Sequence, residues 1–119
     1  MEKVIILEKA KAFAVKVIKV CEALNCNAIK SVLAKQLAKS ATSIGANIHE
    51  ATYAASGNDF INKLQIALKE CHETEYWLEL IKEAGYLPEE EAAKLSTECG
   101  TIRKQLIKSI TTAKARNIQ

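Results

Sequence analysis

The sequence predicts an all-α fold, an up-down-up-down antiparallel four-helix bundle that forms a single domain over residues 1–119. Apolar residues recur at spacings of three and four through four long segments, which is the period of helices with one buried face. Only 4 Gly and 1 Pro occur in 119 residues, so few positions interrupt these segments. The breaks between them are short, and short connections place successive helices antiparallel.

The first two helices are expected at about residues 3–25 and 28–54, with a polar break at 25–27. Each has a seam, meaning the residues that face the core. The first seam is Ile6, Ala10, Phe13, Val17, Val20 and Leu24. The second is Ile29, Leu33, Leu37, Ser40, Ile44, Ile48 and Ala51. Gly45 interrupts the second helix, where glycine costs roughly 1 kcal/mol, so we expect a close neighbour or a slight bend there.

The last two helices are expected at about 57–84 and 88–115. Their seams are Phe60, Leu64, Ala67, Cys71, Thr74, Leu78 and Ile81, then Ala92, Leu95, Cys99, Ile102, Leu106, Ser109 and Ala113. Ser56 and Asp59 resemble a capping box at the start of the third helix. Gly85 is expected at the position just past the end of the third helix, where glycine is common. Pro88 suits the first turn of the fourth helix.

The apolar segments are too short for export or membrane insertion. No stretch approaches the roughly 18 apolar residues of a membrane span, and Val4–Leu7 is too short for a signal peptide. We therefore expect a cytoplasmic protein with no membrane partner. The four cysteines form no C-x-x-C pair, and we expect free thiols, three of them on buried stripes, rather than a disulfide framework.

The sequence offers no catalytic constellation. Di-iron bundles need Glu-x-x-His, but Ala46 precedes His49 by three positions and Lys69 precedes His72. Cys71 is adjacent to His72, and adjacent helical side chains point about 100° apart. Phosphate-loop motifs are absent. The prediction is a protein that is not an enzyme, with no catalytic residue, no cofactor and no metal.

Charge is distributed unevenly along the chain. Residues 1–55 carry 8 Lys and Arg against 4 Asp and Glu, residues 56–98 carry 4 against 10, and residues 99–119 carry 5 against none. Seven residues are candidates for nucleic-acid binding: Lys35, Lys39, Arg103, Lys104, Lys108, Lys114 and Arg116. The first helix adds Lys9, Lys16 and Lys19. Two interpretations stay open, solvated helix faces or an anionic partner such as RNA or DNA held through its phosphates.

Two further stripes lie beside the seams. Ile66, Trp77 and Leu80 lie more than 90° from the seam of the third helix, which indicates an oligomer interface or the partial exposure of one large residue. A polar set comprises Gln36, Ser40, Ser43, Asn47, Glu50 and Glu73. It indicates either structural polar contacts that fix packing and register, or a ligand site.

Residues 36–50, QLAKSATSIGANIHE, resemble the QLxRSAxSIxANIxEG signature of the four-helix bundle proteins encoded in intervening sequences of bacterial 23S rRNA genes. A second block agrees, namely Asp59, Phe60, Leu64, Ile66, Ala67, Glu73, Thr74, Glu75 and Leu78. Gly85-Tyr86-Leu87 also fits, so the resemblance covers roughly residues 5–113. Lys39 replaces the signature's arginine and Ala51 its glycine, so any bidentate pairing of that arginine is not expected here.

The resemblance implies a bacterial up-down-up-down bundle that assembles into a homopentamer. It also implies similarity to the accessory protein of diversity-generating retroelements, a basic pentamer that associates with nucleic acid and a reverse transcriptase. No catalytic residue carries over, and the polar set is assigned to structural contacts.

Three hypotheses follow. The first is a non-enzymatic homo-oligomer that binds RNA, DNA or a ribonucleoprotein partner. The alternative is a protein-protein interaction scaffold without nucleic acid, in which the acidic middle third pairs with basic ends of other copies. A bundle that binds a small ligand or metal is a third.

Overall fold

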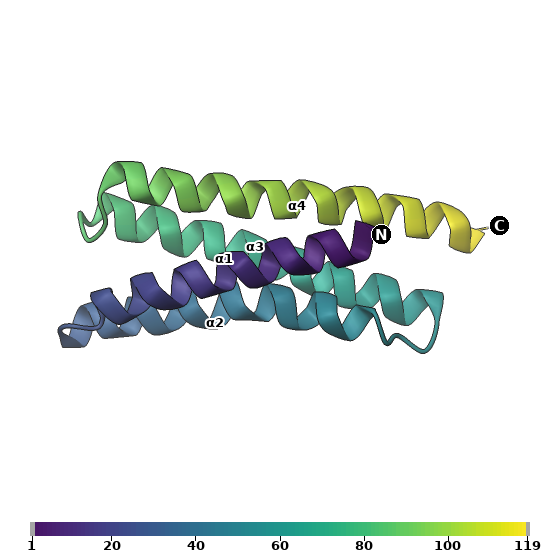
Figure 1. The fold of residues 1–119 in the computed structure, drawn as a ribbon, viewed down its shortest axis with the longest axis horizontal. Coiled ribbons are helices and arrows are strands. Elements are labelled where there is room, and N and C mark those ends of the chain that lie inside the picture. Colours follow the sequence, from purple (N-terminus) through teal and green to yellow (C-terminus); the bar gives the residue numbers. More distant parts are fainter. Residues whose placement is uncertain (1, 119) are drawn as a thin grey trace.

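The computed structural model describes residues 2–118, with side chains described for residues 5–117. Over this range the chain forms four helices and no strand, and they are α1 (Glu2–Leu24), α2 (Ala28–Ala51), α3 (Gly57–Glu83) and α4 (Glu89–Ile118). They alternate in direction along a rod of 52 × 22 × 20 Å (Figure 1). This confirms the predicted all-α antiparallel bundle.

Two helix ends differ by three residues from the prediction. α2 ends at Ala51 rather than at about 54, because the N–H groups of Thr52, Tyr53 and Ala54 bond to carbonyls three residues back and tighten the last turn. α4 continues to Ile118 rather than stopping at about 115.

The helix starts are capped by side chains. The Asn27 Oδ1 atom accepts a hydrogen bond from the Lys30 N–H at 2.9 Å at the start of α2. At the start of α3, Ser56 Oγ accepts from the Asp59 N–H at 3.1 Å, and the Asp59 carboxylate accepts from the Ala55 N–H at 3.2 Å. The predicted capping box is therefore present, with its return bond to the residue before the cap.

The end of α3 also agrees with the prediction. Gly85 has φ 78°, a left-handed conformation that favours glycine. Its N–H donates to the Lys82 carbonyl, and the Tyr86 N–H donates to the Ile81 carbonyl. These two bonds form a Schellman motif, which ends the helix and turns the chain towards α4.

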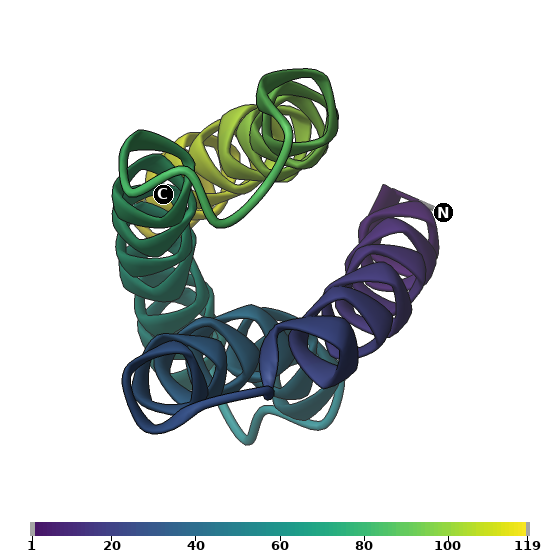
Figure 2. The ribbon, with the colours of Figure 1, turned by 90° about the vertical axis from the view of Figure 1, so that its left-hand side faces the viewer.

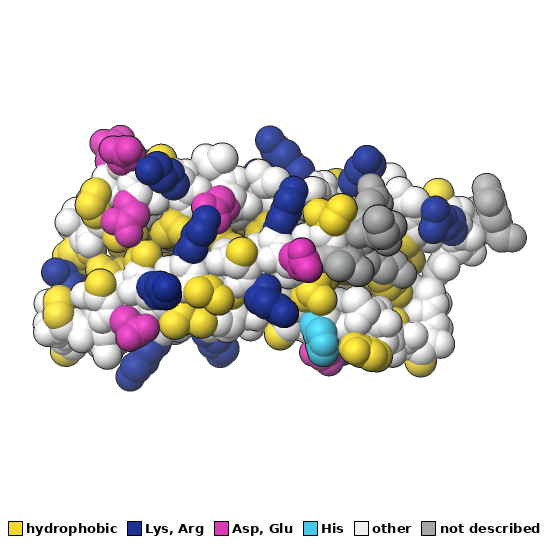
Figure 3. Space-filling model, in the orientation of Figure 1, with side chains coloured by type: hydrophobic (Ala, Val, Ile, Leu, Met, Phe, Trp, Pro, Cys, Tyr) yellow, Lys and Arg dark blue, Asp and Glu magenta, His cyan; other side chains and the backbone are white. Residues whose placement is uncertain are grey.

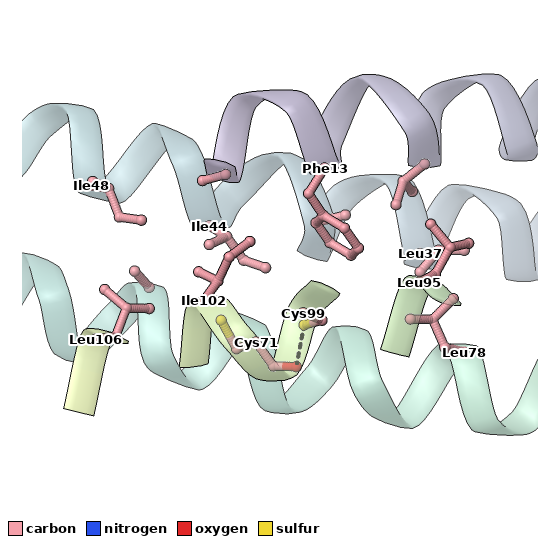
Figure 4. Close-up of a cluster of buried hydrophobic side chains, with 14 of the residues drawn as sticks. Phe13, Leu37, Ile44, Ile48, Cys71, Leu78, Leu95, Cys99, Ile102 and Leu106 are labelled. Carbon is pink, nitrogen blue, oxygen red and sulfur yellow. Dashed lines mark hydrogen bonds between the residues drawn. The ribbon is translucent and has the colours of Figure 1, made fainter. Parts of the chain in front are cut away.

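The four seams meet in one core, part of which is drawn in Figure 4. Phe13, Leu37 and Leu106 are fully buried, and Thr74 and Ser40 are the buried polar residues of the described part. The prediction is wrong for Ile29, whose side chain is 66% exposed in the first turn of α2. An added Cβ on Gly45 would lie 3.6 Å from the Ala10 Cβ, so the expected close neighbour is α1.

The cysteines lie where the seams predict. Cys21, Cys71 and Cys99 are buried, Cys26 is exposed, and all four are free thiols. Burial raises the pKa of the Cys21 thiol to about 11. The pKa of Cys99 is also raised, first by its hydrogen bond with Cys71, whose carbonyl oxygen accepts from the Cys99 Sγ atom at 3.6 Å, and then by burial.

The bundle is least closed between α1 and α4. Viewed along its length, the four helices form an open C whose gap separates these two (Figure 2). α1 packs much more extensively on α2 than on α4. A 2.7 Å ion pair between Lys16 and Glu98 bridges this side. Gln105 follows Glu98 by seven residues and so lies on the same flank of α4. Its Oε1 atom is buried without a hydrogen-bond partner within the described residues.

Candidate functional site

The seven predicted nucleic-acid-binding cations do not form one patch. Lys35 and Lys39 lie on α2, and the other five lie on α4. These two helices lie diagonally across the bundle (Figure 2). The cations of α2 and α4 therefore point to different sides.

Arg103, one of the seven, is held in an ion pair. Arg103 Nε donates to the Glu75 Oε1 atom at 2.9 Å, and both side chains are little more than a quarter exposed. This contact joins α4 to α3. Arg103 thus serves the packing of two helices in this structure, a pairing that the sequence analysis did not find.

Lysines are exposed on α1 and α4, the two helices that border the open side of the bundle. Lys9, Lys16 and Lys19 of α1 and Lys104 and Lys108 of α4 are exposed. The Lys16–Glu98 ion pair shows that the two helices flank each other here. Dark blue side chains are spread over both helices on the side drawn in Figure 3. We refer to these five lysines as the basic face.

The end of α4 carries the remaining two cations. Lys114 and Arg116 are exposed, and each borders a shallow pocket where α4 meets the start of α3. From Cys99 onwards α4 contains no Asp or Glu. The cationic end of α4 therefore has no carboxylate within the same stretch of the helix to offset it.

Opposite α1, α3 is acidic. It carries six carboxylates against three lysines: Asp59, Glu70, Glu73, Glu75, Glu79 and Glu83, against Lys63, Lys69 and Lys82. Because α1 and α3 are diagonal in the bundle, the basic face and the acidic helix lie on different sides (Figure 2). Carboxylates therefore outnumber lysines on α3, whereas the opposite side carries both lysines and carboxylates (Figure 3).

A hollow of about 850 Å³ lies between α2 and α3. Its lining includes Gln36, Lys39, Ser40, Glu70, Glu73, Tyr76 and Trp77, and we refer to it as the α2–α3 hollow. The rings of Tyr76 and Trp77 lie 5.1 Å apart at 69°, an edge-to-face pair. Residues from both blocks of the family resemblance thus meet at one surface.

The carboxylates of the hollow lie close together. The pKa of Glu70 is raised, first by partial burial, then by a hydrogen bond with Glu73 and by the charge of Glu73. The charges of Lys69 and Lys39 act in the opposite direction and do not cancel this effect. The Glu70 carboxyl therefore holds its proton more readily than an isolated glutamate does.

The predicted polar set divides into two groups. Four members make hydrogen bonds or an ion pair. Ser40 Oγ accepts from the Thr74 hydroxyl across the α2–α3 contact at 2.9 Å, and Glu50 pairs with Lys63 at 3.5 Å. Ser43 and Asn47 bond to carbonyls of α2 itself. The other two, Gln36 and Glu73, are exposed in the hollow.

The predicted outer stripe is less exposed than expected. Ile66 and Trp77 are half-buried, Trp77 packs against the core, and Leu80 is 37% exposed. Tyr76, which the sequence analysis did not select, is 57% exposed. Tyr76 lies further around the helix from the seam than Trp77 does. Its position on the helical wheel could therefore have identified it as an exposed aromatic residue.

Within the described residues no group of three or more His, Cys, Asp or Glu side chains is arranged to hold a metal ion. Over the same residues no helix is both long and apolar enough to cross a membrane.

Comparisons with known proteins agree with this picture. The model of the 23S rRNA-intervening sequence protein family matches residues 2–108. The chain is 42% identical to a protein of unknown function from the S23 ribosomal protein family of Bacteroides thetaiotaomicron, known from a crystal structure. The match covers 93% of this chain and 99% of the other, with a TM-score of 0.89. Among curated proteins none matches the chain.

Proposed function

Since the chain belongs to the 23S rRNA-intervening sequence protein family, we propose that it is a non-enzymatic homo-oligomer that binds RNA or DNA through its basic face. The observation that carries the proposal is the placement of lysines from α1 and α4 on one side of the bundle, away from the acidic α3. Phosphate groups are the partners that such a surface attracts over a distance.

The chemistry of the basic face favours backbone binding. Lys104 and Lys108 are one helical turn apart, so their ammonium groups can engage neighbouring phosphates. Neither α1 nor α4 exposes an aromatic side chain on which a base could stack. The proposed interaction is therefore electrostatic and tolerant of sequence.

Self-association is the second part of the proposal, and the homopentamer is the assembly that the family resemblance implies. Exposed apolar side chains support it, among them Tyr76, Leu80 and Val32. A ring of copies would repeat the basic face around its axis and raise avidity for a long polyanion. The matching family's description refers to 23S rRNA, which makes fragments of that RNA the first probes.

Size-exclusion chromatography with light scattering tests both parts. The protein is run alone and with RNA at about 50 mM and about 200 mM salt, since counterion release makes phosphate binding weaker at higher salt. We expect an oligomer that co-elutes with RNA at the lower salt and less at the higher. A protein that does not co-elute with RNA at low salt would refute nucleic-acid binding, and a monomer would refute self-association.

The second candidate function is a protein-protein interaction scaffold. The α2–α3 hollow favours it, because an exposed aromatic pair beside carboxylates suits a protein segment better than a nucleic acid. In the same experiment this candidate predicts an oligomer whose elution RNA does not change.

A further inference from the structure

The α2–α3 hollow combines two groups that bind organic cations. Trp77 and Tyr76 form an edge-to-face pair, and an indole or phenol ring attracts a guanidinium or ammonium group at its face. Glu70 and Glu73 line the same hollow and offer charge-assisted hydrogen bonds to such a group. These groups would favour an arginine or lysine side chain, in a lining that also contains Lys39, Lys69 and His72.

Among the described residues, neither carboxylate of the hollow is held in an ion pair, although the charges of Lys69 and Lys39 act on Glu70. Among residues 5–117, no Lys, Arg or His nitrogen lies within 4.0 Å of Glu70 or Glu73. Lys39 also lines the hollow but remains beyond that distance. A cation placed between the two carboxylates would relieve their mutual repulsion.

An apolar strip extends from one end of the hollow. The Ser40–Thr74 bond and the shared lining of Gln36 and Trp77 set the antiparallel register of α2 and α3. In that register Val32 lies opposite Leu80, one turn beyond Gln36 and Trp77. Val32 is 59% exposed and Leu80 37% exposed. A cationic segment with some apolar surface fits this combination better than a solvated ion does.

The chain itself carries a segment of that kind. The last turns of α4 combine Lys114 and Arg116 with small residues and carry no carboxylate. Figure 1 shows this end of α4 reaching the far end of the rod. Charge complementarity therefore joins the end of α4 to the acidic α3.

The end of α4 cannot reach the hollow of its own chain. The Asn117 side chain donates to the Asn58 Oδ1 atom at 2.9 Å, which places the end of α4 beside the start of α3. Glu73 lies fifteen residues further along α3, which is about 20 Å at the helical rise of 1.5 Å per residue. The occupant must come from a second copy.

We propose that the α2–α3 hollow receives Arg116 and Lys114 from the end of α4 of a neighbouring copy, with the guanidinium group between the Glu70 and Glu73 carboxylates and the Trp77 ring. This inference rests on the proposed self-association and specifies its contact. The contact joins two different surfaces, so it repeats from copy to copy and closes into a ring when the rotation allows.

Charge reversal tests the contact. Glu70→Lys with Glu73→Lys, and separately Lys114→Glu with Arg116→Glu, are expected to lower the mass measured by light scattering. The four substitutions together are expected to restore it. Glu83→Lys on α3 and Lys104→Glu on α4 are matched controls, because each reverses an exposed charge of the same helix outside the contact. All the substituted positions are wholly or partly exposed, so circular dichroism should report intact helices.

Crosslinking gives a second measurement. In a Cys26→Ser background, Glu73→Cys with Arg116→Cys is expected to give disulfide-linked dimers and larger species under mild oxidation. The separation of about 20 Å within one chain is too long for an internal bridge. Glu83→Cys with Arg116→Cys is the control and should give fewer linked species.

The outcomes separate this inference from the proposed function. If both charge reversals leave the oligomer's mass unchanged, or if the combined variant does not restore that mass, the contact is overturned and self-association stands. A monomeric wild-type protein overturns both. RNA binding is measured on the same variants, and it depends on Lys104 but not on Glu73 if the basic face and the hollow act separately.

Discussion

The salt dependence of RNA binding gives the most direct quantitative test of the basic face. The perturbation is Lys104→Ala with Lys108→Ala, which removes the α4 half of that face. Both side chains are exposed, so the substitution should not disturb the core. The matched control is Lys35→Ala with Lys39→Ala, which removes two lysines at the same spacing from α2.

The expected magnitude follows from the number of lysines. We assign about four phosphate contacts per copy to the five lysines of the basic face. On single-stranded RNA the slope of log K against log salt is then about −2.8, so affinity falls about 50-fold between about 50 and 200 mM salt. The double variant keeps about two contacts, with a slope of about −1.4 and a fall of about 7-fold.

Fluorescence anisotropy with a labelled mixed-sequence RNA measures this slope across a salt series, at protein concentrations where light scattering gives one assembly state. The wild type and the Lys35→Ala, Lys39→Ala control should share the steep slope. A double variant with the wild-type slope would refute the reasoning, as would a control that loses as much slope as the double variant.

Three predictions concern the fold. Thr74→Val should lower the free energy of unfolding by about 1–2 kcal/mol, because the buried Ser40 oxygen then accepts no hydrogen bond, and adding Ser40→Ala should cost little more because it removes that oxygen. Gly85→Ala should cost about 1 kcal/mol because φ is 78°, whereas Gly100→Ala, inside α4, should stabilise by about the same amount. At pH 8 only Cys26 should react quickly with a thiol reagent, because burial protects the other three thiols and raises the pKa of Cys21 to about 11.

Each of these has a clear contrary result. Chemical denaturation at fixed protein concentration would contradict the first if the double variant lost as much as the sum of the two single variants. Equal effects at the two glycines would contradict the second. For the third, two or more fast thiols in the native protein, or a fast phase that survives Cys26→Ser, would show that the buried cysteines are accessible.

The spacing of apolar residues was sufficient to predict the helices and most of the core. Phe13, Ile44 and Leu106 lie on seams spaced by three and four, and all three are fully buried. Gly85 was correctly predicted to end α3, because glycine commonly occupies the left-handed position just past the end of a helix. The prediction that Ile29 is buried was wrong, because Ile29 lies in the first turn of α2, opposite the end of α3, where the bundle no longer covers it.

The candidate sites were less predictable, because they depend on how helices are placed side by side. Glu75 and Arg103 are 28 residues apart, and only the register of α3 against α4 makes them partners. The sequence patterns indicated three different roles for Lys39, Glu73 and Trp77, and the register of α2 against α3 brings them to one hollow. Periodicity identifies the face of one helix but does not fix the register of two.

The open side of the bundle has a consequence for how the native state fluctuates. α1 is held mainly by α2, and its border with α4 contains the Lys16–Glu98 ion pair and the buried, unsatisfied Gln105 oxygen. Few apolar contacts would be lost if α1 detached from α4, so we expect subglobal opening to begin there. In native-state hydrogen exchange, the amides of α1 should exchange ahead of those in the middle of α3, while the other three helices remain protected.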